Sequence, residues 1–229
     1  MLGTPRLHLA VTASTMDHAR ELAHAGAPHG ALVTTAQQTA GRGRQGRAWS
    51  APAGSSLLMS LILREAPALL PLAAAVAVAE ACATPAAAIK WPNDVLVDGR
   101  KVAGILAEGR PQEGWWVLGI GVNVALDPAD LPPELRDTAA TLGRAPDGVE
   151  PFLADLLGAL ERALTAPAEQ LLDAWRARDA LAGREVRWNA GAGIARGVDG
   201  EGRLVIELAD GGRTALNAGE VHLGTGARA

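Results

Sequence analysis

Cysteine is nearly absent from this sequence, with Cys82 the only one in 229 residues. A single cysteine excludes an internal disulfide framework and a zinc site built from several cysteines. The longest mainly apolar run, 66–79, is interrupted by Pro67 and Pro71 and is too short to span a bilayer. The chain does not begin with a basic segment followed by an apolar core. We therefore expect no signal peptide, no membrane contact and a cytoplasmic location.

Positive charge and lysine are also scarce. The formal net charge of −4 gives no general attraction to nucleic acid. Of the 21 basic residues, only Lys90 and Lys101 are lysine, and both lie in one short stretch. A coding bias toward arginine explains the scarcity, but it does not explain why the two lysines lie together. The stretch that holds them is therefore a candidate site.

The hydrophobic pattern predicts an α+β protein. Buried or alternating runs predict strands at 6–11, 31–37, 55–63 and 115–124, and helices are expected near 14–25, 69–83, 152–164 and 168–178. Asp98-Gly99 joins two strand-like runs, which indicates a hairpin. From Gly183 onward, short strands alternate with glycine turns, as in a small β-barrel. We expect two domains, 1–182 and 183–229.

The segment GRGRQG, residues 41–46, has the G-x-G-x-x-G spacing of a dinucleotide-binding turn. That turn must lead into a helix, whereas here Pro52 and Gly54 precede a strand-like run. Glycines that permit close backbone approach, together with arginine side chains, suit carboxylate or phosphate oxygens. The segment therefore indicates an anion-binding loop, and the alternative is a solvated loop that binds RNA weakly.

The second candidate is KWPNDVLVDGRKVAGILAEG, residues 90–109. A hairpin that turns at Asp98-Gly99 would place Asp94 and Lys101 nearly opposite each other. The pair could be a surface ion pair, worth about 0–1 kcal/mol. It could instead be a site in which Asp94 holds Mg²⁺ beside substrate phosphates and Lys101 neutralises a transferring phosphoryl group.

The motifs together resemble biotin protein ligases. STM (14–16), QTAGRGRQGRAW (38–49), KWPNDVLVDGRKVAGIL (90–106) and GIGVNV (119–124) occur in the order seen in that family. The resemblance covers nearly the whole chain and implies a short form without an N-terminal DNA-binding domain. It implies a mixed sheet with flanking helices, like that of class II aminoacyl-tRNA synthetases, and a small Src-homology-3-like C-terminal barrel. The implied activity joins biotin and ATP into biotinyl-5′-AMP and then transfers biotin to a lysine of a biotin carboxyl carrier protein.

The resemblance also implies a role for each matching residue. Biotin binding falls on Ser14, Thr15, Gln38, Arg42, Gly43, Arg44, Lys101 and Gly104. Binding of ATP or the adenylate falls on Arg42, Arg44, Arg47, Trp49, Lys90, Asn93 and Asn123, with Gly119 and Gly121 leaving room for the adenine. Lys101 and Arg44 would be catalytic, and Asp94 would hold the magnesium ion. The sequence departs from the family pattern at Met16, where asparagine is common, and at Gln45, where arginine is common.

Other functions remain as alternatives. A lipoate or octanoyl transferase would share the fold, but octanoyl transferases use a cysteine nucleophile, and Cys82 lies in an expected buried helix. A biotin-sensing repressor would need a helix-turn-helix domain, and the ligase motifs already begin at Ser14. A plain RNA-binding module is disfavoured by the negative charge. The expected partners are biotin, ATP and a carrier protein, without nucleic acid, and relatives are monomers or homodimers.

Overall fold

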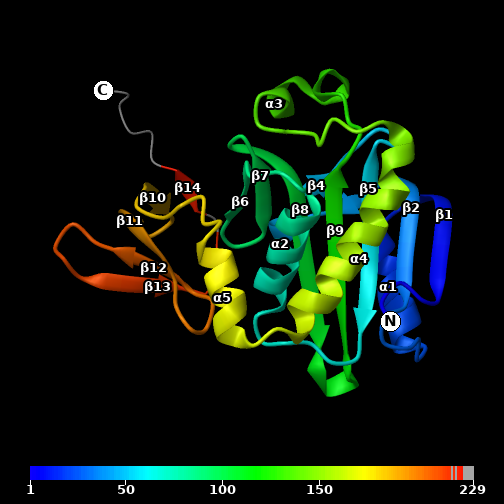
Figure 1. Ribbon diagram of the computed structural model, residues 1–229, viewed down its shortest axis with the longest axis horizontal. Helices are drawn as coiled ribbons and strands as arrows, with labels where there is room; N and C mark the ends of the chain where they lie inside the picture. Colours follow the sequence, from blue (N-terminus) through cyan, green and yellow to red (C-terminus); the bar gives the residue numbers. More distant parts are fainter. Residues whose placement is uncertain (218, 220, 224–229) are drawn as a thin grey trace.

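A seven-stranded mixed sheet forms the centre of the computed structural model, which describes residues 1–217, 219 and 221–223 (Figure 1). Across the sheet the order is β1, β2, β5, β9, β8, β7, β6; β1 and β2 are parallel and the other neighbours antiparallel. The strands are β1 Arg6–Thr12, β2 Leu32–Gln38, β5 Ser56–Leu63, β6 Ala87–Lys90, β7 Asp94–Val97, β8 Arg100–Arg110 and β9 Trp115–Asn123. This arrangement confirms the predicted α+β class.

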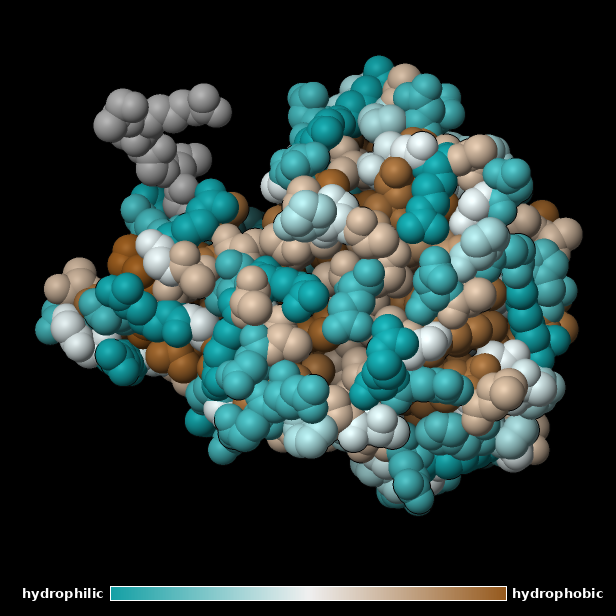
Figure 2. Space-filling view, viewed as in Figure 1, coloured by the Kyte–Doolittle hydropathy of each residue, from teal (hydrophilic) through white to brown (hydrophobic). Residues whose placement is uncertain are grey.

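Helices cover both faces of this sheet. On one face lie α2 (Leu70–Ala81) and α4 (Val149–Thr165), with α5 (Ala168–Arg176) packed against α2 (Figure 1). On the other face, α1 (Thr15–His24) packs on β5 and β9. Every residue of β5 is buried, as its apolar pattern predicts for a strand covered on both sides. Figure 2 shows the face of α4 and α5, where hydrophilic side chains are interspersed with hydrophobic ones.

A second, five-stranded antiparallel sheet ends the described chain. It orders β13, β12, β11, β10 and β14, with bounds β10 Glu185–Trp188, β11 Gly191–Val198, β12 Leu204–Glu207, β13 Arg213–Leu216 and β14 His222–Leu223. The expected small β structure is thus present. Its inner residues belong to the same apolar cluster as α2 and α4, so the division into 1–182 and 183–229 stays a prediction. Residues 218, 220 and 224–229 of the second predicted domain lie outside the described residues.

The predicted hairpin joins β7 and β8, but its register differs from our expectation. Asp98 and Gly99 have φ values of 50° and 74°, as a tight hairpin turn requires. Next to the turn, Lys101 pairs with Leu96. The register then shifts between Val95 and Leu96, so that Asp94 pairs with Gly104. The prediction that residues 94 and 101 face each other across the ladder is therefore wrong in register. Within the described residues, no helix is long and apolar enough to cross a bilayer.

Candidate active site

A cavity of about 520 Å³ opens on the α1 side of the central sheet. Its walls are the N-terminus of α1, the β7–β8 hairpin, the middle of β8 and β9, and the short ribbon of β3 (Gly41–Arg42) and β4 (Ala48–Trp49). All the predicted site residues line it: Ser14, Thr15, Gln38, Arg42, Gly43, Arg44, Arg47, Trp49, Lys90, Asn93, Asp94, Lys101, Gly104 and Asn123. Segments far apart in the sequence therefore meet in one place of a size typical for small-molecule sites.

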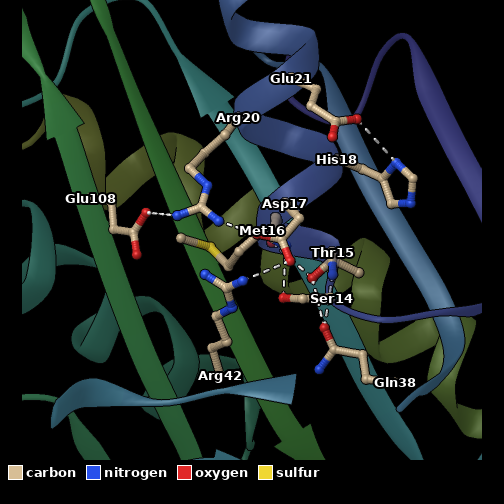
Figure 3. Close-up of polar contacts among 11 residues, drawn as sticks. Ser14, Thr15, Met16, Asp17, His18, Arg20, Glu21, Gln38, Arg42 and Glu108 are labelled. Atoms are coloured by element: carbon tan, nitrogen blue, oxygen red, sulfur yellow. Dashed lines mark hydrogen bonds and ion pairs between the residues drawn. The ribbon is translucent and has the colours of Figure 1, made fainter. Parts of the chain in front are cut away.

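One end of the cavity is a buried network of hydroxyl and amide groups (Figure 3). The backbone N–H of Thr15 donates to Gln38 Oε1 at 2.8 Å, which fixes the orientation of the Gln38 amide. The Thr15 hydroxyl donates to the same oxygen at 3.2 Å. Ser60, fully buried on β5, donates to Thr15 Oγ1 at 2.8 Å. The Thr15 oxygen thus keeps one lone pair, and the Gln38 NH₂ group keeps its hydrogens.

Ser14 completes this end of the cavity. Its Oγ accepts from the Met16 N–H at 3.3 Å as the N-cap of α1, so its own hydrogen remains available as a donor. The hydroxyl–amide end therefore offers an acceptor on Thr15 and donors on Ser14 and Gln38. This polarity matches a cyclic urea, whose N–H groups donate and whose carbonyl accepts. Ser60 was missed from sequence, although a serine inside an otherwise apolar strand signals a buried polar partner.

The other end of the cavity is cationic. Lys101 Nζ lies 2.7 Å from Asp94 Oδ1, so the ammonium and carboxylate meet despite the shifted register. The backbone of Lys101 is held by the loop that follows β9: its N–H donates to Thr138 O at 2.8 Å, and its carbonyl accepts from Ala140 at 2.7 Å. This loop therefore forms one wall of the cavity and fixes the Lys101 backbone.

Arg44 is held by Asn93. The Asn93 Oδ1 accepts from Arg44 Nη1 at 3.2 Å, and its Nδ2 donates to the carbonyl of Ile105 at 2.9 Å. The carbonyl fixes the amide so that its oxygen faces the guanidinium. The adenylate-binding role that the resemblance implies for Asn93 stays a prediction. Within the protein, its amide positions Arg44, an arginine of the segment 41–46, which we call the glycine–arginine loop. Gln45, the residue after Arg44, has a left-handed backbone (φ 56°).

Trp49 lies against two glycines that pair directly across β8 and β9. A Cβ atom would lie 2.9 Å from the indole at Gly104 and 2.6 Å from it at Gly121. At Gly119, a Cβ would lie 2.6 Å from the sulfur of Met16. We expected Gly119 and Gly121 to leave room for adenine, but Met16 and Trp49 fill those spaces. Lys101 Nζ lies 5.6 Å from the Trp49 ring centroid, which adds a cation–π contact.

Asn123 also uses part of its hydrogen-bonding capacity within the protein. Its Nδ2 donates to Ala140 O at 2.9 Å, and its Oδ1 accepts from Ser56 at 3.4 Å. One N–H and one lone pair remain for a ligand. These contacts tie the loop after β9 to the sheet, so Asn123 shapes the cavity wall as well as lining it.

The protein groups alone do not fit a magnesium site. Within residues 1–217, 219 and 221–223, no cluster of three His, Cys, Asp or Glu side chains could hold a metal ion. Asp94 lines the cavity, but its Oδ1 already pairs with the Lys101 ammonium. A cation held directly by that oxygen would compete with Lys101.

A cysteine nucleophile is excluded. Cys82 follows α2, is buried, and has no place in the cavity lining. Burial raises the pKa of its thiol to about 11, so the reactive thiolate is scarce at neutral pH. The expectation that Cys82 belongs to the core is confirmed.

Comparison with known proteins gives a consistent result. Residues 8–124 match the biotin/lipoate A/B protein ligase family, and residues 183–224 match the biotin protein ligase C terminal domain. The chain is 37% identical to the biotin–[acetyl-CoA-carboxylase] ligase of Paracoccus denitrificans, over 94% of this chain and 99% of that protein. It is 36% identical to the Mycobacterium tuberculosis protein of the same name, over 84% and 78% of the two chains.

Two further comparisons concern length and structure. The bifunctional ligase/repressor BirA of Bacillus subtilis is 42% identical over 63% of this chain, but the match spans only 48% of that relative. The biotin protein ligase from Aquifex aeolicus, solved in complex with biotin and ATP, superimposes with a TM-score of 0.79 and 27% identity, covering 96% of this chain and 98% of that one. The predicted class II synthetase-like fold is confirmed, and the chain belongs to the biotin/lipoate A/B protein ligase family.

Proposed function

We propose that this protein is an ATP-dependent biotin protein ligase. The observation that carries the proposal is one cavity with a urea-compatible hydrogen-bonding end and a cationic end. Biotin has a ureido ring at one end and a carboxylate at the other, so one molecule would satisfy both ends. The Aquifex aeolicus relative was solved with biotin and ATP, which supports the same ligands for this chain.

The ureido ring would bind at the hydroxyl–amide end. A ring N–H would donate to Thr15 Oγ1, and the ring carbonyl would accept from Ser14 and Gln38. Lipoate and octanoate carry no urea, and neither would satisfy these buried polar groups. Because leaving buried donors and acceptors unpaired costs about 1–3 kcal/mol each, the site would discriminate against both acids.

The first reaction would occur at the cationic end. The biotin carboxylate attacks the α-phosphorus of ATP, an O–P bond forms, and the bond to pyrophosphate breaks. Both reactants are anions, so Lys101 and the arginines of the glycine–arginine loop would lower their repulsion and hold them in line. Arg42 and Arg44 would contact the carboxylate and phosphates, Arg47 the departing phosphates, and Trp49, Lys90, Asn93 and Asn123 the nucleotide side of the cavity.

The second reaction would transfer biotin to a carrier protein. The amine of an acceptor lysine attacks the carbonyl carbon of the mixed anhydride, a C–N bond forms, and AMP leaves. We propose a biotin carboxyl carrier protein as this partner, because the relatives are named as ligases for acetyl-CoA carboxylase. No nucleophilic side chain is needed. We propose that any magnesium ion enters with the ATP phosphates, since Asp94 is engaged by Lys101.

Biotin-dependent exchange of labelled pyrophosphate into ATP tests the proposal. The wild-type protein should exchange with biotin and not with lipoate or octanoate. Lys101→Met should abolish exchange, whereas Lys101→Arg, which keeps the charge near Asp94, should retain a measurable part of it. Equal circular dichroism spectra would show that both variants fold. Near-wild-type exchange by Lys101→Met, or exchange with lipoate in place of biotin, would contradict the assignment. A DNA gel shift tests the repressor alternative separately.

A further inference from the structure

Four charged side chains of alternating sign lie beside the hydroxyl–amide end of the cavity (Figure 3). Glu108 Oε2 accepts from Arg20 Nη1 at 3.1 Å, Arg20 also pairs with Asp17, and Asp17 Oδ2 accepts from Arg42 Nη2 at 3.1 Å. Of these four, only Arg42 lines the cavity. The other three therefore act on a ligand only through Arg42.

Three of these four residues, Asp17, Arg20 and Glu108, belong to well-packed elements. Asp17 lies in the first turn of α1, directly after the buried residues Ser14, Thr15 and Met16. Glu108 belongs to β8, inside the central sheet. Asp17, Arg20 and Glu108 have side chains that are only 30%, 32% and 35% exposed. Asp17 is thus a fixed carboxylate, oriented by Arg20 from behind.

Arg42 lies on a segment that needs such an anchor. Its side chain is 50% exposed, and it belongs to the two-residue strand β3 at the start of the glycine–arginine loop. Glycine loses more conformational freedom on ordering than other residues. A contact that fixes Arg42 would therefore order the part of the loop that faces the hydroxyl–amide end of the cavity. Asn93 performs the matching role for Arg44 at the opposite wall.

We propose that Asp17 is a positioning residue that holds Arg42 and thereby keeps the glycine–arginine loop closed over bound biotin and its adenylate. The inference rests on the proposed function. Arg20 sits between Asp17 and Glu108, so its charge is shared and Asp17 retains attraction for Arg42. Asp17 has no contact with ligand of its own.

Dissociation of preformed biotinyl-adenylate tests this role. Asp17→Asn should release the adenylate roughly 2- to 5-fold faster, the range expected for a partly exposed ion pair. It should also raise the KM for biotin in pyrophosphate exchange while kcat stays unchanged. Asp17→Glu should behave like wild type. The decisive variant is the double mutant: Asp17→Asn added to Arg42→Ala should give the same release rate as Arg42→Ala alone.

Glu150→Gln is the matched control. It breaks a comparable pair, with Arg6 Nη2 2.6 Å from Glu150 Oε1, and neither residue lines the cavity. This variant should release the adenylate at the wild-type rate. An unchanged rate for Asp17→Asn, or additive effects in the double mutant, would overturn the inference while leaving the ligase function in place. A wild-type protein without biotin-dependent exchange would overturn the proposed function and this inference with it.

Discussion

Thr15 shows how a single buried hydroxyl can be restricted to one hydrogen-bonding role. Its own N–H orients the Gln38 amide, its hydrogen goes to that amide oxygen, and one of its lone pairs is used by Ser60. The remaining lone pair can only accept. A ligand must therefore bring a donor to this point, which excludes a carbonyl or ether oxygen there. The restriction comes from Gln38, which receives the hydrogen, and from Ser60, which occupies the other lone pair without lining the cavity.

Removing the Ser60 hydroxyl should weaken biotin binding without slowing the chemistry. In Ser60→Ala the Thr15 oxygen loses one of the two contacts that hold its hydroxyl in place, a hydrogen bond worth about 1 kcal/mol. We expect the KM for biotin in pyrophosphate exchange to rise roughly 5-fold with kcat unchanged. Ser55→Ala is the control, because Ser55 donates to Pro52 O in the preceding loop. A KM equal to that of the control would show that Ser60 does not orient Thr15.

Arg44 and Asn93 should act as a pair on the lifetime of the adenylate. Arg44→Ala removes a cation from the loop that would cover the intermediate, so biotinyl-AMP should leak from the protein. Asn93→Ala leaves the arginine but removes the amide oxygen that receives it, so it should reproduce part of the leak. The measurement is release of labelled biotinyl-AMP without acceptor protein. An unchanged release rate in Arg44→Ala would contradict the idea of a closing loop. An unchanged release rate in Asn93→Ala would show that other contacts, and not Asn93, position Arg44.

At the scale of elements, the glycines of β8 and β9 shape the cavity floor. Gly104 and Gly121 pair across the two strands and together form a flat surface for the Trp49 indole. Neither has a positive φ, so the reason for glycine is space and not backbone conformation. The glycines of β8 and β9 thus determine where the Trp49 side chain can lie.

Gly121→Ala should displace Trp49 from this surface. The new Cβ would lie 2.6 Å from the indole, too close for any real contact, so the ring must move. We expect altered tryptophan fluorescence and a loss of biotin-dependent exchange of at least 10-fold, with the fold intact. Gly109→Ala is the control, because its Cβ would collide with the Trp116 indole outside the cavity. Equal activity of the two variants would show that the position of Trp49 does not matter for the reaction.

The elements also show how far sequence alone could go. Periodicity placed α2, β5 and the hairpin correctly, because local burial and the Asp98-Gly99 turn determine them. The predicted pairing of residues 94 and 101 was wrong, because the two-residue turn at Asp98-Gly99 already pairs Lys101 with Leu96. The further shift comes from one extra residue of β8, between Lys101 and Ala103, which leaves no mark in the hydrophobic pattern. The loop after β9 was not placed at the cavity because backbone hydrogen bonds to Lys101 attach it, and backbone groups carry no sequence signal.

All the predicted site residues line one cavity, but several side-chain contacts of these residues could not be predicted from the sequence. Motif resemblance assigned roles toward ligands and said nothing about contacts between the residues themselves. Asn93 holds Arg44, Trp49 covers Gly121, and Asp17 pairs with Arg42. Such contacts depend on side-chain geometry between segments distant in sequence, which neither spacing nor composition contains.

At the scale of the whole molecule, Trp91 joins the two sheets. It belongs to the stretch that carries both lysines, yet its side chain points away from the cavity lining and is 2% exposed. Its Nε1 donates to the buried carbonyl of Gly202, between β11 and β12, at 3.1 Å. The apolar cluster continues from α2 into the second sheet. We therefore expect the described chain to unfold as one cooperative unit.

Trp91→Phe should lower the stability of both sheets together. The variant loses a buried hydrogen bond and leaves the Gly202 carbonyl unpaired, which costs about 1–3 kcal/mol in the free energy of unfolding. Urea denaturation followed by circular dichroism and by tryptophan fluorescence should give coincident transitions shifted to lower urea. Trp188→Phe, the same substitution at a half-buried position within the second sheet, should cost less. A loss no larger than that of Trp188→Phe would show that the Trp91 contact does not join the sheets. Two separate transitions in the wild-type protein would show that the predicted parts 1–182 and 183–229 fold independently.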